Sequence, residues 1–168
     1  MDVPALVARL EAFPDAVEAL VRGLDLAAWR WRPADGGWSA LEIVGHLLAE
    51  ERDDFRLRLG LLLRDPAAPW DPLDAEAAVT VGRFQELDPA ATLVAFRAER
   101  AASVAWLRAL DAPRWDHARA TRNDGPLHAG DLLASWAAHD ARHLGQLAKR
   151  LHGLAARAGA PFSVRYAG

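Results

Sequence analysis

Apolar residues recur at intervals of three and four along four long segments of this 168-residue chain, and this spacing constrains its fold more than any other feature. It is the spacing of one face of an α-helix. No segment alternates apolar and polar residues over a useful length, and the runs at 79–81 and 162–164 are too short to count as strands. Four long helices with connections of short to medium length predict an all-α four-helix bundle, in a single domain over residues 1–168.

Local signals place the ends of these helices. The expected helices are 2–22, 39–64, 88–110 and 128–157. Pro14 lies inside the first and is expected to kink or break it. Ser39 and Glu42 have the spacing of a capping box at the start of the second. Residues 65–87, rich in proline and acids, predict a long crossover between the second and third helices, and 112–125 predict an irregular connection.

The composition excludes several classes of function. The chain has no cysteine, which rules out disulfides, zinc–cysteine sites, iron–sulfur clusters and a cysteine nucleophile. Its net charge of −3 gives no basic field for a nucleic acid or an anionic membrane. Neither a signal peptide nor a run of ~20 apolar residues is present, so we expect a cytoplasmic protein with no membrane partner. Positive residues near the C-terminus are expected on a solvated face: Arg142, Lys149, Arg150, Arg157 and Arg165.

Three histidines on two of the expected helices suggest a metal site. His139 and His143 lie four residues apart, so they project from one helix face close enough to share an ion. His46 lies between Glu42 and Glu50 on a polar stripe that borders an apolar face. The pair His139 and His143 alone is also typical of surface histidines, and His46 alone of a partly buried histidine with a structural role. Together they favour a metal site between packed helices, and three imidazoles with an open position are typical of a catalytic rather than a structural ion.

Other residues near these histidines are candidates for supporting roles. Glu50 is a possible general base, and Gln146 a contact to substrate or water or else an exposed side chain. Asp140 falls on the apolar face and needs a partner there. It could accept a hydrogen bond from a histidine, but a structural bond to an indole or a backbone amide is the favoured interpretation. Trp38 and Trp136 are expected to pack beside the site. The remaining histidines are expected to be incidental: His117, His128 and His152.

Two segments carry a resemblance to a known family. The run WSALEIVGHL at 38–47 resembles the W-S-x-x-E-(I/V)-x-x-H-L segment of the DinB-like superfamily, and HDARHLGQ at 139–146 resembles its H-D-x-x-H-x-x-Q segment. Pro14 and the Trp-Arg-Pro turn at 31–33 agree as well, so the likeness covers nearly the whole chain. The resemblance implies an up-down-down-up bundle with a long crossover after the second helix. It also implies a divalent metal ion held by His46, His139 and His143.

The same resemblance implies a metal-dependent enzyme, because some members of the superfamily are transferases or isomerases that use a low-molecular-weight thiol, and others are described as metal-dependent hydrolases. Zinc or nickel is the expected metal, and a small molecule the expected substrate. Because the chain has no cysteine, any thiol must come from a substrate or cosubstrate. The alternatives are a non-catalytic stress-response module that binds a metal or ligand, and a bundle without metal. Related bundles often pair through helix faces, so we expect a homodimer.

Overall fold

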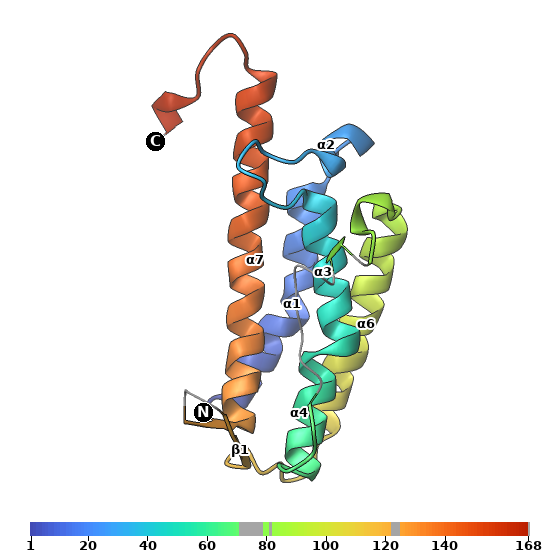
Figure 1. Ribbon diagram of the computed structural model, residues 1–168, viewed down its shortest axis with the longest axis vertical. Helices are drawn as coiled ribbons and strands as arrows, with labels where there is room; N and C mark the ends of the chain where they lie inside the picture. The colour runs from blue at the N-terminus through green and yellow to red at the C-terminus, as the bar shows by residue number, and fades with distance from the viewer. Residues whose placement is uncertain (71–78, 81, 122–124, 168) are drawn as a thin grey trace.

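The computed structural model describes residues 1–70, 79–80, 82–121 and 125–167, and its long helices lie side by side in one bundle (Figure 1). The helices are α1 (Val3–Val21), α2 (Leu26–Arg30), α3 (Ala40–Asp53), α4 (Phe55–Arg64), α6 (Pro89–Ala109) and α7 (Ala129–Ala158), with short 3-10 turns η1 (Phe84–Glu86) and η2 (Arg165–Ala167). In Figure 1, α1 and α7 run upward, whereas α3, α4 and α6 run downward. The expected up-down-down-up four-helix bundle is therefore confirmed.

The N-terminal helix starts where the sequence predicts but does not break at its proline. The Asp2 carboxylate accepts a hydrogen bond of 3.0 Å from the Ala5 amide, which caps the first turn. α1 continues through Pro14 to Val21, so of the expected kink or break, the break is wrong. Pro14 is buried among the apolar residues with which α1 packs on α6 and α7, and this packing maintains the helix despite the missing amide.

The second expected helix is present as two, α3 and α4. Its capping box is confirmed, since Ser39 Oγ accepts from the Glu42 amide at 3.2 Å and Glu42 Oε2 accepts from the Ser39 amide at 2.9 Å. The helix is interrupted at Asp54, whose φ of −124° and ψ of −92° are not helical. The Asp54 carboxylate pairs with Arg58 at 2.7 Å. A short acidic side chain that bonds locally favours such departures from helical geometry.

A small antiparallel hairpin occupies part of the connection that was expected to be irregular. Strands β1 (Ala118–Ala120) and β2 (Pro126–His128) pair with Ala118 opposite His128. Strands of this length are too short to show an alternating pattern, which is why the expectation of no strands is wrong here. Residues 122–124 of this connection, and 71–78 and 81 of the long crossover, lie outside the described residues.

The core consists of two apolar clusters with a polar cluster between them. One apolar cluster includes Phe13 and Phe96, and the other includes Trp136. The guanidinium of Arg100 lies over the rings of Phe13, Phe96 and Trp136, at 5.3, 5.4 and 5.7 Å from their centroids, so it contacts both clusters. Among the described helices, none is long and apolar enough to cross a membrane.

Candidate metal centre

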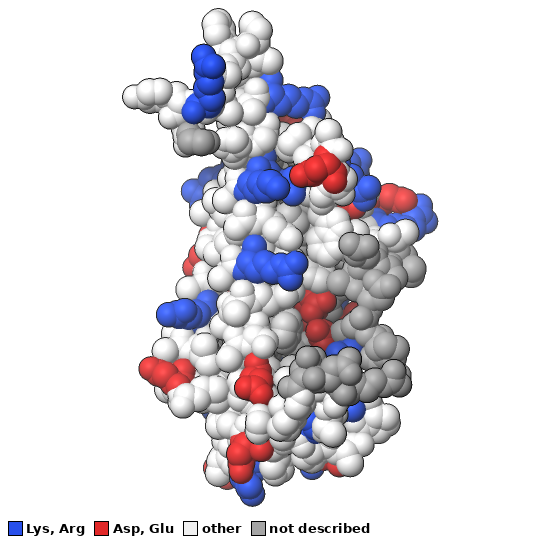
Figure 2. Space-filling model, turned by 60° about the vertical axis from the view of Figure 1, so that its left-hand side comes forward, with Lys and Arg blue, Asp and Glu red and all other residues white. Residues whose placement is uncertain are grey.

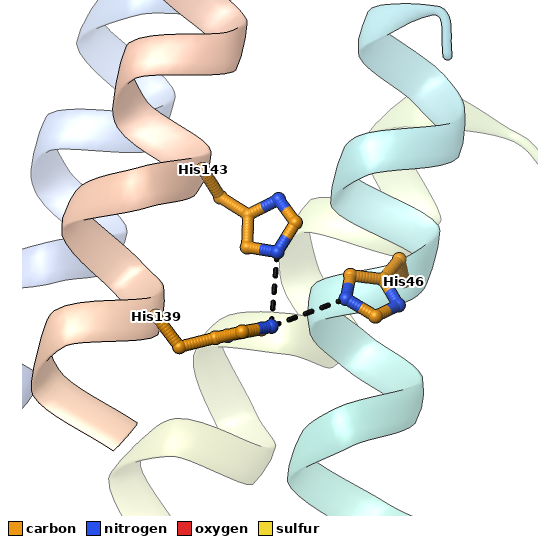
Figure 3. Close-up of side chains that lie close together, drawn as sticks. All are labelled: His46, His139 and His143. Atoms are coloured by element: carbon orange, nitrogen blue, oxygen red, sulfur yellow. Dashed lines mark hydrogen bonds between the residues drawn. The ribbon is translucent and has the colours of Figure 1, made fainter. Parts of the chain in front are cut away.

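The structure brings the three candidate histidines together. His46 projects from the middle of α3, and His139 and His143 project from successive turns of α7, with all three rings turned toward one another (Figure 3). Nε2 of His139 lies 3.3 Å from Nε2 of His46 and 2.9 Å from Nε2 of His143. One ring nitrogen from each residue lies within 4.8 Å of the other two.

This spacing fits a shared metal ion. Nitrogen ligands at 2.0–2.1 Å from a tetrahedral zinc ion are about 3.3 Å apart, close to the two separations seen here. Gln146 Oε1 accepts a hydrogen bond of 2.8 Å from His143 Nδ1, so in neutral His143 the Nε2 atom carries the lone pair that faces the other rings. Nδ1 of His46 has no hydrogen-bond partner among the described residues, and Glu50 Oε1 lies 3.6 Å from it.

All three rings are neutral at pH 7, which is the form that binds metal ions. Burial lowers the pKa of His46 to about 4, that of His139 to about 3 and that of His143 to about 4. The positive charge of Arg142 lowers each of these pKa values further. Repulsion from neighbouring protonated rings also lowers the pKa of His46 and His139, whereas the hydrogen bond to Gln146 partly offsets the fall for His143. The protonated form of the three rings is therefore disfavoured, and the neutral form is suited to binding a cation.

A pocket of about 520 Å³ opens beside the histidines and gives a small molecule access to them. Trp38 forms part of its wall, with its ring centroid 4.9 Å from that of His46 and stacked parallel to His143 at 6.4 Å. Gln146 also lines the pocket, although its carbonyl oxygen is bound to His143. Trp38 therefore lies beside the histidines, at the position where the sequence analysis expected it, and its role there stays a prediction.

Trp136 lies one layer further from the histidines than expected. It is buried and stacks on Phe55 at a centroid distance of 5.4 Å, and Phe55 in turn lies 5.1 Å from the ring of His139. The Trp136 indole N–H donates to Glu51 at 3.1 Å, so this side chain belongs to the core rather than to the pocket wall.

Glu50 lines the pocket next to His46. Burial raises the pKa of its carboxyl to about 8, and the neighbouring Asp54 carboxyl adds to the rise. A carboxyl with a pKa near neutrality can exchange protons at pH 7, which is the property that a general acid or base requires. Its role as a base stays a prediction.

Among the described residues, Asp140 bonds to none of the expected partners, neither a histidine nor an indole nor a backbone amide. Its two oxygens accept from Arg100 at 2.5 and 2.9 Å, and Glu51 accepts from the same guanidinium at 2.6 Å. Ser103 donates to Glu51 at 2.7 Å, and all four residues are buried. The expectation that Asp140 bonds to a neutral donor is therefore wrong, and its partner is a charged guanidinium. A buried arginine requires a negative partner, and this requirement outweighs a bond to a neutral donor.

Sequence reasoning missed Arg100, Glu51 and Arg150. Arg100 lies four residues from both Phe96 and Val104, in line with the apolar stripe of its helix, and this position could have identified it. Arg150 was expected on a solvated face, but only 7% of it is exposed and it lines the pocket of the histidines. A turn preceding α3 covers it, and the sequence of α7 alone does not reveal that contact.

Fold and site together define a class of protein: a four-helix bundle in which histidines from two helices form a candidate metal centre beside a pocket. The sequence profile of the DinB superfamily matches residues 9–147, and the chain belongs to this superfamily.

The fold of this chain is similar to that of a solved structure. It is YfiT from Bacillus subtilis, described as "a probable metal-dependent hydrolase with an unusual four-helix bundle topology". The match has a TM-score of 0.76 at 19% sequence identity and covers 89% of this chain and 87% of that chain. A comparison with curated proteins found no match.

Proposed function

We propose that His46, His139 and His143 bind one divalent metal ion, zinc or nickel, and that the protein is a metal-dependent enzyme acting on a small molecule. The observation that carries this proposal is the convergence of three neutral ring nitrogens within 4.8 Å of one another beside an accessible pocket. A metal ion at such a site supplies either a bound water with a pKa near ~7 or a holding point for a thiolate.

The proposed reaction is hydrolysis or transfer of a small thiol to an electrophile. The description of YfiT as a probable metal-dependent hydrolase supports the first. The absence of cysteine from the chain is compatible with the second, provided that the thiol is brought in by a cosubstrate. In either case Trp38 and Gln146 shape the pocket, Gln146 orients the His143 ring through Nδ1, and Glu50 is placed to exchange a proton with the substrate.

Metal binding and turnover are tested separately. The chelator-stripped chain is dialysed against Zn²⁺ or Ni²⁺, and we expect one ion per chain, with none retained by a His46→Ala, His139→Ala double variant. Equal uptake by that variant would contradict the site. Loaded protein is then assayed on panels of esters and amides, and on mixtures of small thiols and electrophiles. Stoichiometric metal without turnover on either panel would favour the non-catalytic stress-response module. A cytoplasmic location and a homodimer are part of the same proposal and rest on the sequence.

A further inference from the structure

A second charged group, the guanidinium of Arg150, lines the pocket and keeps one buried donor without a hydrogen bond. Arg150 projects from α7 and is only 7% exposed, yet its Nε atom makes no hydrogen bond to any described residue. Buried guanidinium groups in folded proteins are normally paired, because an unpaired buried charge is strongly destabilising. A buried arginine that lines a pocket and keeps an unbonded donor therefore indicates a further partner from outside the chain.

The turn before α3 is shaped to leave room for this side chain. A Cβ atom at Gly37 would lie 2.7 Å from Nη2 of Arg150 and 3.3 Å from its Cζ, so a larger residue there would require the end of the Arg150 side chain to shift. The carboxylate of Asp35 is close enough for its charge to act on Arg150, but its hydrogen bond goes to another group. It accepts from the Gly37 amide at 3.1 Å and lies 3.7 Å from Lys149 Nζ. The turn thus lies against the Arg150 guanidinium, and among the described residues no carboxylate forms a direct ion pair with it, although the charge of Arg150 contributes to lowering the Asp35 pKa.

We propose that Arg150 binds an oxyanion, a carboxylate or phosphate group, carried by the small-molecule substrate. This inference rests on the proposed function, in which the reacting end of the substrate lies at the histidines. It adds that the acidic end of the same substrate lies at Arg150. Arg142, two helical turns before Arg150 on the same side of α7, lines the same pocket and adds positive charge.

The geometry also limits the length of the substrate. Seven residues separate His143 from Arg150, which corresponds to about 10 Å along the helix axis. Arginine side chains on a helix lean toward its N-terminus, and on α7 this brings the guanidinium nearer to the histidines. The pocket wall includes Trp38 and Ile43 as well as Gln146, which suits a linker several bonds long that is largely apolar or unsaturated.

The charge around the pocket supports an anionic ligand. The described lining residues include two arginines and two carboxyl groups, Asp35 and Glu50, whose charges at most balance. A divalent ion held by neutral histidines would therefore leave the pocket with a net positive charge. Figure 2 shows basic side chains at intervals over the upper half of the face that it displays, where α7 carries its C-terminal half.

Anion binding is tested in the metal-free chain, so that its outcome does not depend on the metal proposal. The chelator-stripped, ¹⁵N-labelled protein is titrated with sodium acetate and, separately, with sodium phosphate, with sodium chloride holding the ionic strength constant. We expect saturable movement of the Arg150 Nε–H signal with at least one of the two anions. Saturation by acetate alone indicates a carboxylate substrate, and saturation by phosphate alone a phosphorylated one. Movement that is linear with both anions, or equally large with chloride, would overturn the inference.

Two substitutions sharpen the test, with the Trp38 indole N–H as the second reporter. Arg150→Lys keeps the charge but removes the planar fork, and we expect affinity for the anion to fall about tenfold. Gly37→Ala should weaken binding as well, since its methyl group displaces the guanidinium. Arg157→Lys, an exposed substitution on the same helix, is the control and should leave affinity unchanged. Should Arg150→Lys not fold, the wild-type titration with through-bond assignment of Arg150 still decides the matter.

Discussion

Replacing Asp140 by alanine should destabilise the protein strongly and leave the metal centre able to bind its ion. The carboxylate lies next to His139 in the chain but points away from the histidines, toward Arg100, with both of its oxygens bonded to the guanidinium at 2.5 and 2.9 Å. Burial raises the pKa of Asp140 to about 6 while Arg100 opposes the rise, so the carboxyl is ionised at pH 7. The substitution therefore removes one charge from a buried ion pair.

The size of the effect follows from burial. Removing one partner of a buried ion pair costs about 3–5 kcal/mol, because the other charge is left uncompensated. Glu51 remains 2.6 Å from Arg100, so we expect the lower end, about 3 kcal/mol. For a chain of this length each kcal/mol lowers Tm by about 2–4 °C, which gives a drop of about 6–12 °C.

A surface pair provides a matched control. Glu11 accepts two hydrogen bonds from Arg108 at 2.7 and 2.8 Å, the same bidentate arrangement, but both side chains are more than half exposed. Because water screens this pair, Glu11→Ala should leave Tm nearly unchanged. Thermal melts by circular dichroism are recorded on the metal-free forms, and zinc stoichiometry is measured separately. Equal shifts for the two variants would refute the argument from burial, and loss of zinc from Asp140→Ala with an unchanged Tm would refute the separation of the two networks.

Four further outcomes are expected. His143→Ala should abolish zinc retention on dialysis, whereas His152→Ala, an exposed position on the same helix, should keep one ion per chain; full retention by His143→Ala would eliminate the proposed site. Gln146→Ala should weaken zinc affinity by about 10–100-fold in competition with a chelator, because Gln146 orients His143; unchanged affinity would show that the hydrogen bond is dispensable. Burial raises the pKa of Glu42, but hydrogen bonds from Arg32, Ser39 and Gln85 outweigh it and lower the pKa overall, so its stabilising effect is present above its unfolded pKa and is lost as pH falls below about 4.5. In urea unfolding between about pH 5 and about pH 3 the wild type should therefore lose more stability than Glu42→Gln, and parallel losses would contradict this. Sedimentation should give the mass of a homodimer, and a monomer at assay concentration would exclude it.

Helix positions could be predicted from the sequence because their signals are local. The capping box of Ser39 and Glu42 and the Asp88-Pro89 start are each contained within a few residues, and the structure begins helices at both. The break at Asp54 could not be predicted in this way. The apolar spacing continues across it through Phe55 and Leu59, and the interruption appears only in the backbone angles of a single residue.

In the candidate site too, features within one helix could be predicted from the sequence, whereas contacts between helices could not. The spacing of His139 and His143 follows from the period of one helix, and His46 was placed by the face of another. The partner of Asp140 required knowledge of a third helix, because Arg100 on α6 reaches both α3 and α7. Patterns along one helix identify which residues face the interior, but not which residue on another helix they meet. The burial of Arg150 depends in the same way on a distant turn.

The buried polar cluster and the histidines use neighbouring positions on the same two helices. On α3, Glu51 faces Arg100 while Glu50 faces the pocket, and on α7, Asp140 faces Arg100 while His139 faces His46. Arg100 therefore ties α3 to α7 by charged hydrogen bonds at the level where both helices present their histidines. Apolar contacts tolerate small shifts between packed helices, whereas charged hydrogen bonds of fixed length and direction favour one register. An ion bound by nitrogens about 3.3 Å apart requires such a fixed arrangement.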